Sequence, residues 1–445
     1  MLIFRRCINV LVLPLLLNGT IVLGMFNTMW PIWVAVLLLL SCYYIFLIVR
    51  PRGGTLPEKR LKTLFNGFEL VLTAEILVSV EIILYVCTVF LPFMPSNIVL
   101  HIINVVLCFL LLWILALSGS IRLFITSSQM GSALRISLML LWWVPVLNYV
   151  LLYKAFRILR EELSISVMKH QRNLDRKGTG YCSTQYPLVL IHGIFFRDWK
   201  LVNYWGRIPD ALAQHEAVLF YGNQQSSASL AGSAAELKQR VQEVLKETGA
   251  EKVNIIAHSK GGLDARYAIS CLGMGQYVAS LTTINTPHRG SVLADKLIQI
   301  APDKFILAVG RNYDKLYAKL GDNQPDFFSG VSDLTEEKCQ ALNEIMPDDP
   351  NVYYQSVASK MRTRFSAPFP LNAGYSIIKP LRGDNDGLVA TDSMAWGHFL
   401  GVFSAIGKRG ISHADIVDLW RKDVSGFDVC ELYVNLVHQL KEQGL

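Results

Sequence analysis

The pattern of hydrophobic and polar positions changes character near residue 186 of this 445-residue chain. Before that point, no Asp, Glu, Lys or Arg occurs between Arg6 and Arg50 or between Glu81 and Arg122. Each of these apolar stretches is about twice the ~20 residues that a helix needs to cross a bilayer. The pattern therefore predicts four membrane spans, which we place at residues 7–25, 30–49, 68–90 and 97–117.

A fifth apolar run, residues 136–153, has the length of a short span but contains Trp142, Trp143 and Pro145. We expect it either to cross the membrane or to enter and return. In the second arrangement, which we favour, every basic cluster of residues 1–178 lies on one side, and the positive-inside rule assigns that side to the cytoplasm. The C-terminal half then faces the cytoplasm. A cleavable signal peptide is the alternative for the first run.

Composition and charge support this division. Charged residues make up 17% of the chain and hydrophobic residues 52%, whereas soluble proteins are about 25% charged. The net charge of +7 divides into +9 for residues 1–178 and −2 for the remainder. The basic residues flank apolar runs instead of clustering on a folded face, which argues against nucleic-acid binding. We expect an integral membrane region over residues 1–155, a basic linker over 156–185 and a globular domain over 186–445.

Two other features of the sequence have simple structural explanations. Glu69, Glu75 and Glu81 fall in the third predicted span, where ionisable side chains often serve transport. Steps of six residues rotate a helical position by about 240°, so these side chains do not share one face. We expect Glu69 at the membrane interface and Glu75 and Glu81 in contact with neighbouring spans, with His101 as a candidate partner. The eight cysteines are spaced too widely for a zinc or redox motif, and we expect free thiols.

From residue 186 onward, short β-branched runs alternate with segments of helical periodicity. This alternation predicts an α/β domain with a mostly parallel sheet and helices on both faces. Active sites of such domains lie at the carboxyl ends of the strands. We expect strands at 187–191, 217–221, 253–257 and 278–284, and helices at 203–214, 229–248 and 260–271.

Segment 254–262, Asn-Ile-Ile-Ala-His-Ser-Lys-Gly-Gly, carries the most chemical information. Ser259 follows a buried strand and opens a helix, with Ala257, Gly261 and Gly262 beside it. A nucleophile on a sharp strand-to-helix turn needs small neighbours, because any Cβ there collides with the adjacent strand or helix. Ser259 is therefore a candidate nucleophile. A serine that only caps the helix is the alternative.

A serine nucleophile requires a base and an acid that orients the base. For a serine on such a turn, the acid and then the histidine follow in chain order. His413, at a loop-to-helix junction, is the preferred base, with His398 as the alternative. Asp386 is the preferred acid and is expected to turn inward at a strand end, with Asp384 as the alternative.

Negative charge on the carbonyl oxygen in the transition state also requires hydrogen-bond donors. Gly193, after the first predicted strand, lets the backbone bend so that the N–H of Ile194 points at the site beside that of Lys260. His192 is expected to be a structural hydrogen-bonding residue.

At these residues the chain resembles the bacterial triacylglycerol lipases of the α/β-hydrolase superfamily. The resemblance covers residues 186–445. It implies a catalytic triad of Ser259, Asp386 and His413, oxyanion donors at Ile194 and Lys260, and hydrolysis of acyl-lipid esters. The matching segments, in order, are 189–193, 257–262 with Arg266 and Tyr267, 286–291, 385–389 and 412–415.

The chain departs from this family near the implied acid and histidine. Many secreted relatives carry a calcium ion near the catalytic histidine and a disulfide near the catalytic aspartate. Asp415 matches one calcium ligand, but the residue four positions on is Leu419, and no Cys lies near Asp386. We therefore expect no cofactor and regard calcium as doubtful.

Residues 291–350 are expected to form either a lid over the acyl pocket, as in many lipases, or ordinary core. They contain helical patterns at 293–300 and 312–320. The aromatic residues that motivate the lid are Phe305, Tyr313, Phe327 and Phe328.

The expected function is that of a membrane-anchored serine esterase or lipase that acts through an acyl-enzyme on Ser259. Its partners would be the lipid bilayer and an acyl-lipid ester. An acyltransferase that uses a lipid or sugar hydroxyl in place of water needs the same triad. A transport or sensing protein with an inert hydrolase domain is the second alternative, and it predicts a degraded triad.

Overall fold

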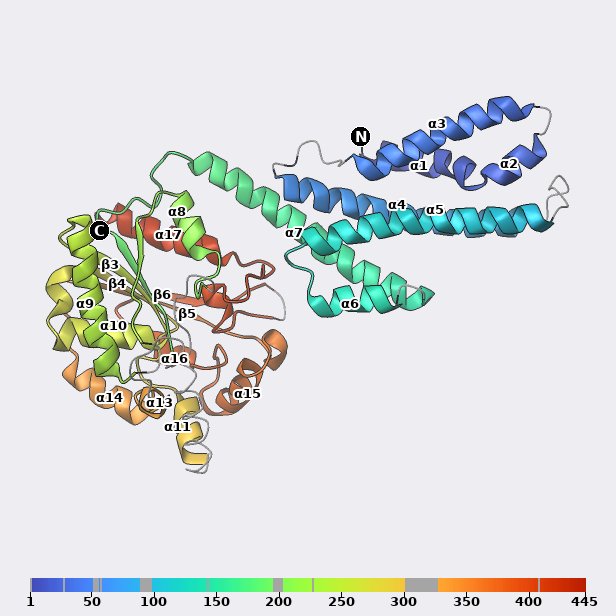
Figure 1. Ribbon diagram of the computed structural model, residues 1–445. Coiled ribbons are helices and arrows are strands. Elements are labelled where there is room, and N and C mark those ends of the chain that lie inside the picture. Colours follow the sequence, from blue (N-terminus) through green and yellow to red (C-terminus); the bar gives the residue numbers. More distant parts are fainter. Residues whose placement is uncertain are drawn as a thin grey trace. The chain divides into compact units, whose positions relative to one another are not determined.

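The computed structural model describes residues 2–26, 29–50, 56, 58–88, 98–141, 144–194, 203–225, 228–300, 327–406 and 409–445. They form two compact units, Met1–Arg172 and Asn173–Leu445 (Figure 1). The boundary falls inside the predicted linker, and residues 156–176 of that linker are helical. The helix continues there because Leu151, Ala155 and Leu159 keep a four-residue apolar spacing and are all buried.

The regular secondary structure of the first unit is helical throughout the described residues. Helices α3, α4 and α5 are long and apolar enough to cross a membrane, and α1 and α2 together make a fourth candidate that is bent by 64°. The fifth apolar run is divided between α6 and α7, and Trp142 and Trp143 lie outside the described residues. The helices are α1 (Leu2–Leu17), α2 (Gly19–Met25), α3 (Trp30–Val49), α4 (Lys59–Thr88), α5 (Ile98–Thr126), α6 (Ser132–Leu141) and α7 (Pro145–Arg176).

Small residues let the helices of the first unit approach closely. A Cβ on Gly67 of α4 would lie 2.9 Å from the carbonyl oxygen of Gly119 in α5, and a Cβ on Gly119 would lie 2.9 Å from that of Gly67. The two backbones therefore touch, which is how helices pack where lipid supplies no hydrophobic driving force between them.

The three glutamates of α4 contact other helices, as expected for Glu75 and Glu81 but not for Glu69. The carboxylate of Glu69 accepts a hydrogen bond from Arg6 in α1 at 3.0 Å. Glu75 is hydrogen-bonded to Asn148 of α7. Glu81 accepts a hydrogen bond of 2.8 Å from Asn18, which stands at the bend between α1 and α2. These contacts explain the glutamates without an ion pathway.

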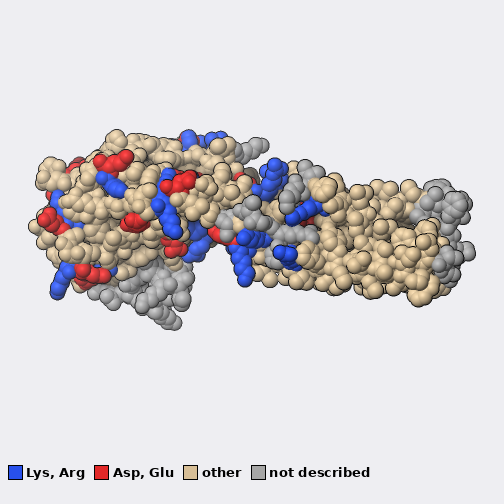
Figure 2. Space-filling model, turned by 90° about the horizontal axis from the view of Figure 1, so that it is seen from above, with Lys and Arg blue, Asp and Glu red and all other residues tan. Residues whose placement is uncertain are grey.

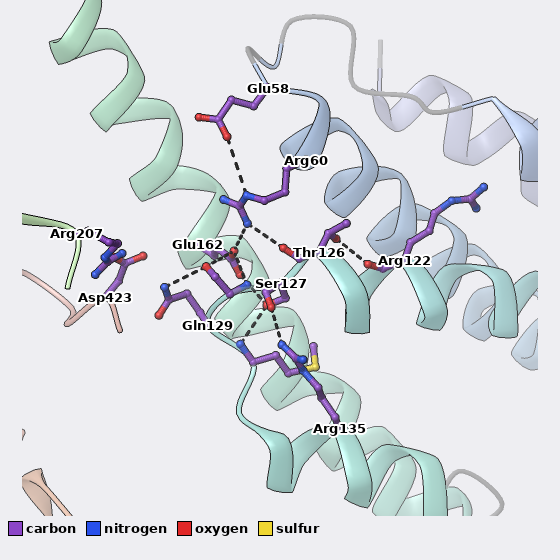
Figure 3. Close-up of polar contacts among 12 residues, drawn as sticks. Glu58, Arg60, Arg122, Thr126, Ser127, Gln129, Arg135, Glu162, Arg207 and Asp423 are labelled. Atoms are coloured by element: carbon purple, nitrogen blue, oxygen red, sulfur yellow. Dashed lines mark hydrogen bonds and ion pairs between the residues drawn. The ribbon is translucent and has the colours of Figure 1, made fainter. Parts of the chain in front are cut away.

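A cluster of polar residues joins four helices at one end of the first unit (Figure 3). Glu162 of α7 is 1% exposed and accepts hydrogen bonds from Arg60 of α4 at 2.7 Å, from Ser127 Oγ at 2.7 Å and from Ser128. Arg135 of α6 donates to the carbonyl of Ser127. Figure 2 shows that Lys and Arg side chains gather at one end of these helices, while the rest of the visible face is uncharged.

The second unit is built on one parallel sheet with the strand order β2-β1-β3-β4-β5-β6. Helices α8 (Ile208–Gln214) and α17 (Val429–Glu442) pack on one face, and α9 (Leu230–Thr248) and α10 (Lys260–Cys271) on the other (Figure 1). The predicted α/β fold is therefore confirmed. The strands are β1 (Leu188–Ile191), β2 (Leu219–Tyr221), β3 (Val253–His258), β4 (Val278–Ile284), β5 (Tyr353–Ser359) and β6 (His398–Phe403).

Strands β5 and β6 are not anticipated by the apolar pattern. The inner strand β5 buries polar side chains, and the amide of Gln355 donates to Thr282 of β4 at 2.8 Å while the hydroxyl of Ser356 donates to the carbonyl of Trp396 at 2.6 Å. The sequence of β5 is therefore not a continuous apolar run. The partners that satisfy its polar side chains lie elsewhere in the chain, so no local pattern marks the strand. The edge strand β6 leaves His398 exposed.

The predicted lid region is only partly described. It contains α11 (Val292–Ile300), α13 (Phe327–Ser332) and α14 (Glu336–Ile345). The expected helix at 312–320, together with Phe305 and Tyr313, lies outside the described residues. Phe328 is 46% exposed.

Candidate active site

Ser259 occupies a strained turn at the carboxyl end of the central strand β3. The strand ends at His258 and α10 begins at Lys260, so Ser259 alone makes the turn, with φ 56° and ψ −131°. A Cβ on Gly261 would lie 2.4 Å from the carbonyl oxygen of His192, and one on Gly262 would lie 2.1 Å from Thr286 Oγ1. Only glycine fits at both positions, which is the physical reason for the small residues in this segment.

His413 and Asp386 form a tight buried pair. Nδ1 of His413 lies 2.5 Å from Oδ2 of Asp386, and the His413 backbone N–H donates to the Asp386 carbonyl at 2.9 Å. The same carboxylate accepts from Asn285 Nδ2 at 2.7 Å and from the backbone N–H groups of Leu388 and Val389 at 2.9 and 2.8 Å. The carboxylate of Asp386 accepts the hydrogen on Nδ1 of His413, which fixes that ring tautomer. Nε2 is then the nitrogen that accepts a proton.

The place of Asp386 in the chain differs from the expectation. It lies in a turn after α15 (Leu371–Arg382), where Asn385 pairs with Ala390, and not at the end of a strand. The turn itself presents the carboxylate, because its own backbone N–H groups bind Oδ1.

The structure brings the segment of the predicted base beside the segment of the predicted nucleophile. The ring of His413 lies with its centroid 4.4 Å from that of His258, the residue before Ser259. His413 belongs to the loop that precedes a 3₁₀ turn at Asp415–Val417. The segments around residues 259, 386 and 413 thus meet at the carboxyl end of the sheet.

The predicted oxyanion donors lie at the same place. A Cβ on Gly193 would be 2.8 Å from Ser259 Cβ, so the loop that carries Ile194 packs directly on the nucleophile turn. Lys260 is the first residue of α10, where backbone N–H groups have no partner within the helix. Its ammonium is buried and donates to Asp264 at 2.7 Å, so the group that Lys260 offers to the site is its backbone N–H. Burial raises the pKa of Asp264 to about 6.

The alternative acid, Asp384, and the alternative base, His398, lie in surroundings that differ from those of Asp386 and His413. Asp384 is partly exposed and paired with Lys360 and Lys379 at 2.7 and 2.8 Å, and these hydrogen bonds lower its pKa to about 2. His398 is exposed on β6. His192 is buried, with its ring nitrogens 2.9 and 3.0 Å from the carbonyl oxygens of Gly193 and Gln224.

Several site neighbours escaped the sequence analysis. Asn285, which binds Asp386, adopts φ 48° directly after β4. Tyr204 and His258 hydrogen-bond each other at 2.5 Å. An Asn at the end of a buried strand is a usable signal for a residue with positive φ, but nothing local marks the tyrosine–histidine contact.

The surroundings of Asp415 do not fit a calcium ion. Its carboxylate accepts hydrogen bonds from Arg409 at 2.7 Å and from Ser412 Oγ at 2.7 Å. Within the described ranges, no three His, Cys, Asp or Glu side chains lie close enough together to hold a metal ion.

Comparisons with known proteins relate the chain to lipases. The model of the palmitoyl protein thioesterase family matches residues 187–357, which is less than half of the chain. A triacylglycerol lipase of Pseudarthrobacter phenanthrenivorans is 43% identical over 120 residues, 26% of this chain and 37% of that protein. A triacylglycerol lipase of Vibrio cholerae is 28% identical over 277 residues, 55% of this chain and 88% of that protein.

Among solved structures, the mature Bacillus licheniformis lipase BlEst2 aligns with 57% of this chain and 91% of its own, at 21% identity and a TM-score of 0.43. The chain spans about a third of the length of two curated triacylglycerol lipases that it matches. The resemblance to triacylglycerol lipases is confirmed by these relatives.

Proposed function

We propose that this relative of the triacylglycerol lipases is a membrane-anchored serine ester hydrolase that acts on acyl lipids. The observation that carries the proposal is the buried pair of His413 and Asp386, 2.5 Å apart, beside the strained turn of Ser259. A nucleophile, a base and an acid that orients the base make up the constellation of serine hydrolases on many folds.

In the proposed reaction, Ser259 Oγ attacks the ester carbonyl carbon while Nε2 of His413 takes the hydroxyl proton. The negative charge on the carbonyl oxygen is met by the backbone N–H groups of Ile194 and Lys260. His413 then gives the proton to the leaving alcohol as the ester C–O bond breaks and the acyl-enzyme forms. Water, deprotonated by His413, attacks the carbonyl carbon of the acyl-enzyme. The bond from that carbon to Ser259 Oγ then breaks, His413 returns the proton to Oγ, and the free acid leaves.

The first unit supports the membrane part of the proposal. Three apolar helices and one bent pair have the length of membrane spans. Their basic residues gather at one end (Figure 2), and the positive-inside rule places that end in the cytoplasm. We propose that the hydrolase unit lies on the cytoplasmic side of the membrane. Its apolar substrates would be dissolved in the adjoining bilayer.

A fluorophosphonate probe, which phosphonylates an activated serine, tests the proposal on the full-length chain in lipid nanodiscs. We expect labelling of the native chain and of Ser270→Ala, a control at a partly exposed serine near the far end of α10, and none of Ser259→Ala. No label on the native chain, or a label that survives Ser259→Ala, would overturn the hydrolase proposal and favour an inert domain.

A further inference from the structure

A buried tyrosine–histidine pair lies against the proposed triad, and the reaction above does not use it. The Tyr204 hydroxyl is 2.5 Å from Nδ1 of His258. Tyr204 is 4% exposed and His258 1% exposed. Burying polar groups costs free energy, so a buried polar pair of this kind implies a structural or functional role.

The tyrosine hydroxyl touches the oxyanion loop. A Cβ on Gly193 would lie 3.1 Å from Tyr204 Oη and 2.8 Å from Ser259 Cβ. The hydroxyl therefore sits at the point where the nucleophile turn and the loop that carries Ile194 meet. Any movement of Tyr204 would therefore displace both the nucleophile turn and the loop that carries Ile194.

The histidine of the pair lies against the proposed base. The rings of His258 and His413 have centroids 4.4 Å apart and planes inclined at 51°. Nε2 of His258 is shielded from solvent. One side of the His413 ring is therefore fixed by Asp386 and another by the imidazole of His258.

We propose that Tyr204 and His258 are a positioning pair that holds the His413 ring toward Ser259 and keeps an uncharged neighbour beside it. The inference rests on the proposed function. The base becomes a cation each time it takes the serine proton, and a second cation 4.4 Å away would oppose that step. An uncharged aromatic ring beside a cation is favourable instead.

The hydroxyl of Tyr204 helps to keep the imidazole of His258 uncharged. In the tautomer of His258 with Nδ1 unprotonated, the Tyr204 hydroxyl donates to Nδ1, so a proton taken up there would have to break that bond. Burial and the neighbouring His413 also lower the pKa of His258 well below its ordinary value. The titratable groups that face His258 are Tyr204 and His413, with Asp386 behind the latter.

Three variants test the pair in the full-length chain in nanodiscs: Tyr204→Phe, His258→Phe and the double variant. His288→Asn is the control, since His288 is equally buried but stacks on Trp396 outside the proposed machinery. Turnover of a short-chain p-nitrophenyl ester gives kcat and KM, and the final extent of fluorophosphonate labelling counts folded sites.

We expect kcat to fall about tenfold in each single variant with KM unchanged, because misorientation acts on the transition state. The double variant should lose no more than the stronger single variant, because both changes break one unit. In Tyr204→Phe, freed Nδ1 takes up a proton more easily, so the acid limb of the pH–rate profile should move to higher pH. Loss of the imidazole in the double variant should return that limb to its native position.

The outcomes separate this inference from the proposed function. If the native chain is neither labelled nor active, the proposed function fails. If the native chain is active and Tyr204→Phe keeps the native kcat and pH profile at full labelling, the positioning pair is refuted. Purely additive losses in the double variant would also refute it.

Discussion

Arg409 donates a 2.7 Å hydrogen bond to the carboxylate of Asp415, two residues after His413. Asp415 also accepts from the backbone N–H and the hydroxyl of Ser412, at 3.1 and 2.7 Å. The turn that carries His413 is thus closed by an ion pair from within the chain. The positive charge that a calcium ion would supply is provided by a guanidinium.

The first prediction follows from this ion pair. Treatment with EDTA should leave the rate of fluorophosphonate labelling unchanged, because no metal is needed to close the turn. Arg409→Ala should lower that rate roughly tenfold, since a displaced base loses its alignment. Arg362→Ala, an exposed arginine nearby in the fold, serves as the control. A rate that falls in EDTA and recovers with added calcium would contradict the prediction.

The second prediction separates two neighbouring aspartates. Asp386→Asn should lower kcat by about 10⁴-fold, because an amide no longer enforces the tautomer with the proton on Nδ1 of His413. Asp384→Asn is the matched control, and it should change kcat little, since Asp384 pairs with Lys360 and Lys379 instead. Ester turnover measures both. Equal losses in the two variants would show that the acid is misassigned.

The third prediction concerns pH and the stability of the second unit. Burial holds the pKa of His258 and of His288 well below its ordinary value, so both are neutral in the folded state. Below about pH 6.5 the unfolded chain binds protons that the folded chain does not, and stability falls with falling pH. The slope is at most about 1.4 kcal/mol per pH unit for each histidine.

Thermal unfolding of the full chain at a series of pH values measures this slope. His288→Asn removes one of the two groups and should flatten the decline below pH 6.5, whatever its effect at neutral pH. An unchanged slope in His288→Asn would mean that this histidine is not neutral in the folded state.

The fourth prediction concerns the polar cluster of the first unit (Figure 3). Glu162→Ala leaves the hydroxyls of Ser127 and Ser128 without their acceptor and should destabilise the first unit by about 1–3 kcal/mol. Arg60 is partly exposed and is rehydrated, which limits the loss. Glu161→Ala, at the exposed neighbouring position, should have little effect. Thermal unfolding of both variants in nanodiscs compares them, and equal midpoints would contradict the prediction.

Local patterns were sufficient for much of the fold. Strands β1, β3 and β4 follow directly from continuous apolar runs, because both of their faces are buried. Helices α9 and α10 follow from apolar periodicity. The helix expected at 203–214 begins only at Ile208. Strands β5 and β6 were missed, because β5 buries polar side chains and β6 is exposed at the edge.

In the candidate site, too, some residues could be predicted from local sequence and others could not. Ser259 is marked locally, since the strained turn demands small residues within three positions on either side. The supporting residues carry no such mark, because their partners are far away in the chain. Asn285 and Asp386 are 101 residues apart, and Tyr204 and His258 are 54 apart.

The sequence by itself determined the two-part organisation of this protein, the parallel sheet and the turn of Ser259, because hydrophobic periodicity and steric demands at a turn act over a few residues. Tertiary structure alone decided which aspartate faces His413, which cation closes the turn beside it and which imidazole packs against its ring. Those choices depend on hydrogen bonds and ring contacts between segments that only folding brings together.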